Sequence, residues 1–233
     1  GGTLVMQDIA STGVTLSRNA GNDDVMLAVT STGKTVTLKN ELSPYNTGLG
    51  VSFSDGVSWS RDQVRDAATT YTWVGSTSNA SLSGNAYGTN VFQFGGGTEV
   101  ANGGARSNFY QVSSGTGQAT INLPTASGSK NELDFVGISN DQLWFGRSGD
   151  NLFVDLLGTN TSVTVNGWFS GAGSQLQEIT AGGLKIDGQV SQLVQAMATY
   201  SANNPGFDPT SSSLHTVPND TSLQSTMSAA WHA

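Results

Sequence analysis

The chain of 233 residues has no cysteine and little charge, with Asp, Glu, Lys and Arg making up 11%. Without cysteine there is no disulfide scaffold and no cysteine-ligated zinc site. The nine Lys and Arg residues form no cluster and the formal net charge is −8. Binding to nucleic acid or to an anionic membrane surface is therefore disfavoured. No apolar run approaches the ~18 residues that a membrane-spanning helix needs.

Motifs for catalysis are also missing. The only histidines, His215 and His232, lie in a polar C-terminal tail, whereas a catalytic histidine needs a packed cleft and an orienting carboxylate. The sequence contains no G-x-S-x-G elbow, no H-E-x-x-H motif and no Walker loop. We therefore expect a protein that is not an enzyme.

The sequence is rich in glycine, with 30 residues, and in alternating apolar and polar positions. Alternation with a period of two, bounded by Gly, Asn, Asp or Ser, is typical of half-buried β-strands and argues against disorder. Helical spacing is brief: Val190, Leu193, Val194 and Met197 predict one amphipathic helix that ends near Asn203. Leu223, Met227 and Trp231 predict a second, terminal helix, and residues 61–68 predict a short helical turn.

A nine-residue rhythm occupies the centre of the chain. Residues 85–93, 94–102 and 103–111 read NAYGTNVFQ, FGGGTEVAN and GGARSNFYQ, with Asn90, Glu99 and Asn108 nine apart. This is the spacing of the nonapeptide G-G-x-G-x-D-x-U-x, whose glycines turn, whose Asp ligates calcium and whose apolar U fills a parallel β-roll. We expect Asn90, Glu99 and Asn108 to lie one above another on consecutive turns of such a roll.

Two alternatives remain for these three positions, because Asn, Glu and Asn stand where the motif has Asp. Calcium prefers charged oxygens, and Asn offers one neutral carbonyl oxygen, so Asn90, Glu99 and Asn108 are weak calcium ligands. Stacked Asn side chains can instead form amide ladders, and aromatic residues can fill the core. Our hypothesis is a roll that folds without metal.

Two segments on either side of the rhythm, residues 8–64 and 137–190, share an apolar pattern. Val25, Leu27 and Val29 match Leu152, Val154 and Leu156, and Val36 and Leu38 match Val163 and Val165. We expect module A over residues 1–70, the nonapeptide region over 71–120, module B over 121–204 and a C-terminal tail over 205–233. The expected fold is all-β: a parallel β-roll flanked by two related β-rich modules, with one or two short C-terminal helices.

Matching loops of the two modules carry acidic residues. Asn22, Asp23 and Asp24 form the densest cluster, and Asp150 lies in the corresponding loop of module B. A peripheral calcium ion at Asp23, Asp24 and Asp150 is one interpretation, and ordinary Asx-turn chemistry is the other. Trp73, between module A and the repeats, is the candidate for an exposed, sugar-stacking aromatic.

The order of these elements resembles the haemolysin-type calcium-binding (RTX) repeat family with its associated domain. The resemblance rests on SGDNLFVDL at 148–156, TSVTVNGWFSG at 161–171, VSFSDGVSWSRDQV at 51–64 and FYQVSSGTGQATI at 109–121. It implies a bacterial protein exported by a type I secretion apparatus to the cell surface or the extracellular matrix. It also implies an uncleaved C-terminal secretion signal, with which the tail LQSTMSAAWHA is compatible.

Two functions follow as hypotheses. The first is a secreted, self-assembling structural module of a surface layer, matrix or filament, in which Gly1–Val5 or the ends of the roll add to a neighbouring copy. The second is a calcium-triggered folding and secretion module of a larger secreted enzyme, toxin or adhesin. Gly1 begins directly in strand-like sequence without an initiator Met, so we expect a fragment or a processed product.

Overall fold

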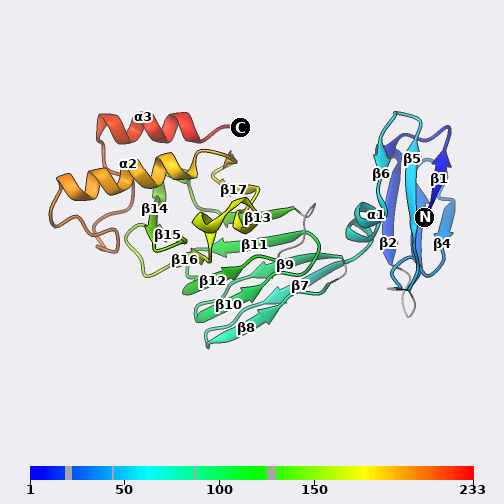
Figure 1. The fold of residues 1–233 in the computed structure, drawn as a ribbon, viewed down its shortest axis with the longest axis horizontal. Helices are drawn as coiled ribbons and strands as arrows, with labels where there is room; N and C mark the ends of the chain where they lie inside the picture. Colours follow the sequence, from blue (N-terminus) through cyan, green and yellow to red (C-terminus); the bar gives the residue numbers. More distant parts are fainter. Residues whose placement is uncertain (19–22, 44, 87, 125–129) are drawn as a thin grey trace. The chain divides into compact units, whose positions relative to one another are not determined.

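The computed structural model describes residues 1–18, 23–43, 45–86, 88–124 and 130–233. The chain is mostly β with a few short helices, and its sheets are open. It forms two compact units (Figure 1): unit 1 comprises Gly1–Tyr71 and Asn85–Thr89, and unit 2 comprises Thr72–Gly84 and Asn90–Ala233. The middle of the predicted loop SRNAGNDD, which includes Asn22, lies outside the described residues.

Unit 1 consists of two three-stranded sheets and one helix. One sheet has the order β1 (Gly2–Met6), β5 (Leu49–Phe53), β6 (Ser58–Trp59), and β1 runs parallel to β5. The other is an antiparallel meander of β2 (Val14–Arg18), β3 (Val25–Val29) and β4 (Thr35–Leu38), preceded by the 3-10 turn η1 (Ser11–Gly13). Helix α1 (Arg61–Ala68) packs on β2 and β5. Ser60 and Gln63 form a capping box that fixes its start.

Unit 2 contains two six-stranded sheets, and from β7 to β13 successive strands alternate between them. The first sheet has the order β18 (Leu184–Ile186), β17 (Glu178–Ala181), β13 (Asn131–Val136), β11 (Asn108–Ser113), β9 (Thr89–Gln93), β7 (Thr70–Val74). The second sheet has the order β14 (Leu143–Ser148), β15 (Asn151–Leu156), β16 (Ser162–Val165), β12 (Gln118–Asn122), β10 (Thr98–Asn102), β8 (Ala80–Ser83). Strands β9, β11, β13 and β17 are parallel neighbours, as are β8, β10, β12 and β16.

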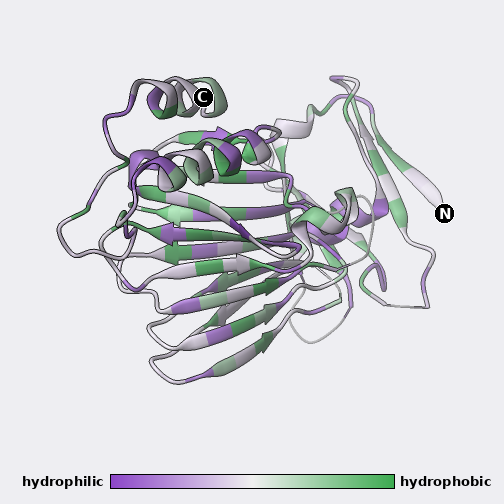
Figure 2. Cartoon of the chain, turned by 60° about the vertical axis from the view of Figure 1, so that its left-hand side comes forward, coloured by the Kyte–Doolittle hydropathy of each residue, from purple (hydrophilic) through white to green (hydrophobic). Residues whose placement is uncertain are grey.

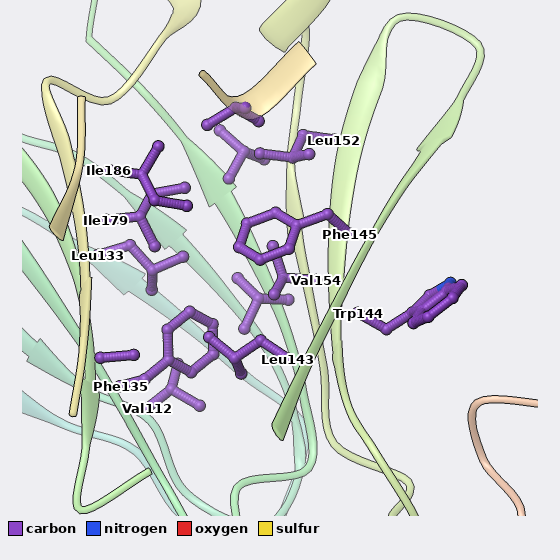
Figure 3. Close-up of a cluster of buried hydrophobic side chains, with 14 of the residues drawn as sticks. Val112, Leu133, Phe135, Leu143, Trp144, Phe145, Leu152, Val154, Ile179 and Ile186 are labelled. Atoms are coloured by element: carbon purple, nitrogen blue, oxygen red, sulfur yellow. The ribbon is translucent and has the colours of Figure 1, made fainter. Parts of the chain in front are cut away.

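The core of unit 2 lies between these two sheets. Hydrophobic and hydrophilic residues alternate along many of the strands (Figure 2), and in β11 and β13 every second side chain is buried, so that one face of the sheet is apolar. Equivalent inward positions stack in register, as Phe92, Tyr110, Leu133 and Ile179 do across β9, β11, β13 and β17. Figure 3 shows Leu133 and Phe135 facing Leu143 and Phe145 across the core.

Helices close the far end of unit 2. The helical spacing predicted two helices, and the structure has α2 (Val190–Asn203) and α3 (Thr221–Ala230) there. Helix α2 packs against β14 and against α3. The 3-10 turns η2 (Asn140–Gln142), η3 (Trp168–Ser170) and η4 (Ala172–Ser174) connect the strands of module B. The C-terminal His232 forms an antiparallel bridge to Lys185 and covers the edge of β18. In the described part of the chain, no helix has both the length and the apolar character that crossing a bilayer requires.

The two segments with a shared apolar pattern have the same order of elements. Each contains a 3-10 turn, a three-stranded meander, a β-hairpin and a helix, from η1 to α1 in module A and from η2 to α2 in module B. Registers correspond as well, since Leu27 faces Val36 while Val154 faces Val163. Strand β1 lies beside β5 as β13 lies beside β17, with Leu4 opposite Val51 and Leu133 opposite Ile179.

Hydrogen bonds of the turns correspond too. The backbone N–H of Asn40 donates to Asp24 Oδ1 at 2.8 Å, and that of Gly167 donates to Asn151 Oδ1 at 2.8 Å. Both donors have a positive φ, 51° for Asn40 and 69° for Gly167. The two modules therefore agree in main-chain detail and not only in the succession of strands.

Candidate functional site: an amide column at the nonapeptide corners

Two of the three predicted nonapeptide ligands are neighbours in the structure. Asn90 and Asn108 are paired in register on β9 and β11, and both are fully buried. The Asn90 side-chain nitrogen donates to Asn108 Oδ1 at 3.2 Å. The expectation that Asn side chains stack into an amide ladder is confirmed for this pair.

The prediction that Glu99 shares this column is wrong. Glu99 lies on β10 in the opposite sheet, in register with Ala80 and Ala119. Nine residues span one strand and one corner, so they cover only half of a coil, and successive nonapeptides alternate between the sheets. Asn90 and Asn108, which are 18 residues apart, complete the coil and therefore stack.

The column continues beyond the nonapeptides, through residues that their spacing did not reveal. Asn108 Nδ2 donates to Asn131 Oδ1 at 2.7 Å, and the Asn131 backbone N–H donates to Gln177 Oε1 at 2.5 Å. At the other end, the Trp73 indole N–H donates to Asn90 Oδ1 at 3.1 Å. The signal for Asn131 was weak because it follows Asn108 by 23 residues instead of 18. We name Asn90, Asn108 and Asn131 the amide column.

The centre of the amide column is the side-chain nitrogen of Asn108. Its two hydrogens are shared among three acceptors, Gly104 O at 3.0 Å, Arg106 O at 2.6 Å and Asn131 Oδ1 at 2.7 Å, while Asn108 Oδ1 accepts from Gly104 N–H at 2.8 Å. Three oxygens thus converge on a nitrogen as they would on a cation. The amide carries its own hydrogen-bond donors and needs no ion at this place.

The calcium ligand set implied by the resemblance does not fit this geometry. Calcium takes six to eight oxygen ligands, including carboxylates. Asn90 and Asn108 supply no carboxylate, their side-chain oxygens accept hydrogen bonds, and Glu99 lies in the other sheet. No shared calcium shell can be built from Asn90, Glu99 and Asn108 as they are placed.

Glu99 has a structural role at the opposite corner. Its fully buried carboxylate accepts the Ser76 N–H at 2.5 Å and the Gly95 N–H at 2.7 Å, and so joins two successive corners. A Cβ atom at Gly75 would overlap this carboxylate, so a larger residue there would displace the Glu99 side chain from its present position. The carboxylate therefore stabilises the turns that contain Ser76 and Gly95.

A second series of Asn residues lies at the ends of the even-numbered strands. Asn122 Nδ2 donates to Asn102 Oδ1 at 2.8 Å, and Asn166 Nδ2 donates to Asn122 Oδ1 at 2.7 Å. Unlike the amide column, it is partly or fully exposed. Its spacings of 20 and 44 residues are irregular, so no periodic pattern predicted it.

The aromatic core is stacked on the same strands as the amide column. The rings of Phe92 and Tyr110 lie 5.1 Å apart at 9°, and Trp73 stacks on Phe92 at 6.5 Å. Trp73, the candidate for an exposed sugar-stacking aromatic, is half-buried, with its ring stacked on Phe92 and its N–H bonded to Asn90. Burial raises the pKa of the Tyr110 hydroxyl well above its usual range.

The acidic loops of the two modules hold ion pairs. Arg18 pairs with Asp23 at 3.4 Å in module A, and Arg147 pairs with Asp150 at 3.2 Å in module B. Asp24 is buried and accepts the Asn40 N–H at 2.8 Å and the Lys39 ammonium at 3.1 Å. These two partners, Asn40 first, lower the pKa of Asp24 below its usual value. Asp23 and Asp150 occupy matching loops of different modules, and the contacts support the Asx-turn interpretation for Asp24.

The described residues also contain no cluster of three His, Asp or Glu side chains able to hold a metal ion. His232 Nε2 lies 3.2 Å from Asp187, and both side chains are exposed. A groove of about 660 Å³ is lined by parts of β13, β17 and β18 and by the loops that follow β13 and β17, with Asp134 and Lys185 among its residues. No protein-family model matches the chain.

Proposed function

We propose that this protein is a non-catalytic, secreted structural module whose centre is a parallel β-roll that folds without calcium. The support for a roll is the alternation of successive strands between two sheets and the parallel pairing within each sheet. This is the arrangement that the nonapeptide pattern would produce. The antiparallel strands and the helices at one end of these two sheets would mark the end of that roll.

One observation carries the proposal: the Asn108 amide nitrogen lies among three oxygens at the corner where the nonapeptide motif has a calcium ligand. Two aspartates in this buried column would repel each other and would need a cation to neutralise them. Asparagines supply donors and acceptors in one neutral group, so the column is satisfied from within. A module of this kind is ready to fold before or without contact with calcium.

The experiment converts the column back to carboxylates. In the double variant Asn90→Asp/Asn108→Asp we expect the unfolding temperature to fall strongly in EDTA, because buried unpaired carboxylates cost several kcal/mol. Millimolar calcium should restore part of the loss. The wild-type protein should unfold at the same temperature in EDTA and in calcium.

The matched control is Asn102→Asp/Asn122→Asp, in the partly exposed series on the other sheet. Solvent screens charges there, so we expect a small loss that is the same with and without calcium. A wild-type protein that unfolds in EDTA would contradict the proposal. It would favour the calcium-triggered secretion module of a larger protein, the second function that the RTX resemblance suggests.

The structural role we propose includes self-association through strand edges. The edges we assign to it are those at the other end of the roll: among the described strands, β7 and β8 are the outermost there in their two sheets, and Val74 on β7 is 69% exposed. Export by a type I apparatus and placement at a bacterial surface or matrix belong to the same proposal and rest on the resemblance. A monomer at high concentration in sedimentation velocity would count against self-association.

A further inference from the structure

Module A contains counterparts of the strands β13 and β16 of module B, but among the described residues of unit 1 no strands pair with these counterparts as β11 and β12 pair with β13 and β16. In module B, β13 pairs with β17 on one side and with β11 on the other, and β16 pairs with β15 and with β12. Among the strands that the structure describes, the matching strands of module A, β1 and β4, each have one partner, β5 and β3 respectively. We define the leading face of module A as the free edges of β1 and β4 together with the apolar residues between them.

The leading face leaves apolar side chains partly uncovered. Leu133 and Val163 in module B are fully buried, because Tyr110 and Ala119 on β11 and β12 lie in register beside them. Their counterparts in module A, Leu4 and Val36, are only half-buried. The difference lies at the side where β11 and β12 would stand.

The two free edges also carry none of the usual protection against pairing. Edge strands are commonly blunted by charged residues, by proline or by a covering element. Strand β1 reads GTLVM and β4 reads TVTL, without charge or proline. The edge strands at the finished end of module B differ, since β18 is bridged by His232 and β14 is packed against α2.

The polarity of the edges decides which partner fits. In module B, β11 and β12 pair with β13 and β16 through one edge of each strand. A parallel coil must use the same edges of its two strands to pair with β1 and β4. In a second copy of this chain those edges are already paired. A second copy could meet the leading face with a leading edge of its own, and the strands would then be antiparallel. The outer edges of its β2 and β6 do not form a parallel coil either, because β6 has only two residues and runs antiparallel to β5.

We propose that the leading face of module A is a docking site for a parallel β-coil of the nonapeptide type. The coil would place a large apolar residue beside Leu4 and another beside Met6, as Tyr110 and Val112 lie beside Leu133 and Phe135. Its second strand would place small or branched residues beside Val36 and Leu38. The inference rests on the proposed function only for the interpretation of unit 2 as a roll, and it is independent of the metal question.

The test supplies this coil from the protein's own sequence. A copy of residues 103–130 is inserted directly before Gly2, so that it precedes β1 as the original precedes β13. Hydrogen exchange is then measured on the full chain. We expect the amides on the free edges of β1 and β4 to exchange about 100-fold more slowly than in the unmodified protein, with unit 2 unchanged.

The matched control insertion has the same length and turns but Asp at the copies of Tyr110, Val112, Ala119 and Ile121. It cannot bury its inner face, so exchange at β1 and β4 should remain fast. Equal protection by both insertions would overturn the proposal, because tethering alone would then explain it. An unmodified chain that is already dimeric, with β1 protected at its free edge, would also overturn it in favour of a second copy.

A longer insertion, a copy of residues 85–130, guards against a single coil being too short to order itself. If neither insertion slows exchange at β1 and β4 while unit 2 keeps its native exchange pattern, the docking site is refuted. Loss of the fold of unit 1 in both insertions has the same meaning. Calcium independence of the wild-type protein is measured separately, so either proposal can be refuted while the other stands.

Discussion

Modules A and B show how the same local pattern can lead to different degrees of burial. They share the order of strands, the register of the meander and the hydrogen bond that closes its turn. Leu133 is fully buried because β11 lies beside it in the sheet, whereas Leu4 is half-buried and no described strand occupies the corresponding position beside β1. Strand formation is thus a local property of these sequences, and completion of the core depends on the next coil.

The largest difference in stability between the modules should appear when the corresponding residues Leu133 and Leu4 are each replaced by alanine. Leu133→Ala should destabilise unit 2 by about 2–5 kcal/mol, since it leaves a cavity in a packed core. Leu4→Ala should destabilise unit 1 by about 1 kcal/mol or less, because a half-buried side chain gives up less surface. Native-state hydrogen exchange in increasing denaturant reports each unit separately. Equal losses at the two positions would show that the leading face is already covered.

An intermediate effect concerns the turn hydrogen bond, which uses a carboxylate in module A and an amide in module B. The lowered pKa of Asp24 means that its contribution is complete above the usual value of 3.8 and is lost as the pH falls through the lower, folded-state value. Asn151 does not titrate. Acid should therefore weaken the turn of unit 1 at Asp24 while the matching turn of unit 2 loses nothing at Asn151.

The variant that checks this is Asp24→Asn, which copies the residue of module B. It keeps an acceptor for the Asn40 N–H and removes the ion pair with the exposed Lys39 ammonium. We expect nearly unchanged stability at pH 7 and a smaller loss between pH 4 and pH 2, measured by urea unfolding of unit 1. An acid loss as large as that of the wild type would assign the pH dependence to other groups.

The smallest effect should come from exchanging the positive-φ residues of the two turns. Asn40→Gly should change the stability of unit 1 by about 0.5 kcal/mol or less, because Asn tolerates this conformation and Gly167 adopts it in module B. Asn40→Val should cost about 1–2 kcal/mol, since branched side chains are strained there. Thermal unfolding of both variants measures the difference. A neutral Asn40→Val would mean that the two turns differ in conformation in solution.

Features that depend on neighbours in the sequence were predicted well. Alternation located the meanders of both modules, and the spacing of Val190, Leu193, Val194 and Met197 located α2. Such patterns report which side of one element is apolar, and that is settled within the element itself. The helical segment at residues 61–68 was expected as a short turn, the counterpart in module A of that helix.

Features that depend on how turns stack were predicted less well. Periodicity gives the repeat of nine but not whether nine residues make a whole coil or half of one, so Glu99 was placed in the wrong column. Asn131 was missed because its connection is longer, at 23 residues against 18. Trp73 was expected at the surface because its partners, Phe92 and Asn90, approach it only when the coils stack.

The far-ultraviolet circular dichroism spectrum of the purified chain in excess EDTA, recorded before and after calcium is added, tests the central claim most directly. If amides replace the ion in the buried column, the spectrum is that of a β-protein in EDTA and does not change with calcium. A coil-like spectrum in EDTA that becomes β-rich on addition of calcium would contradict the account.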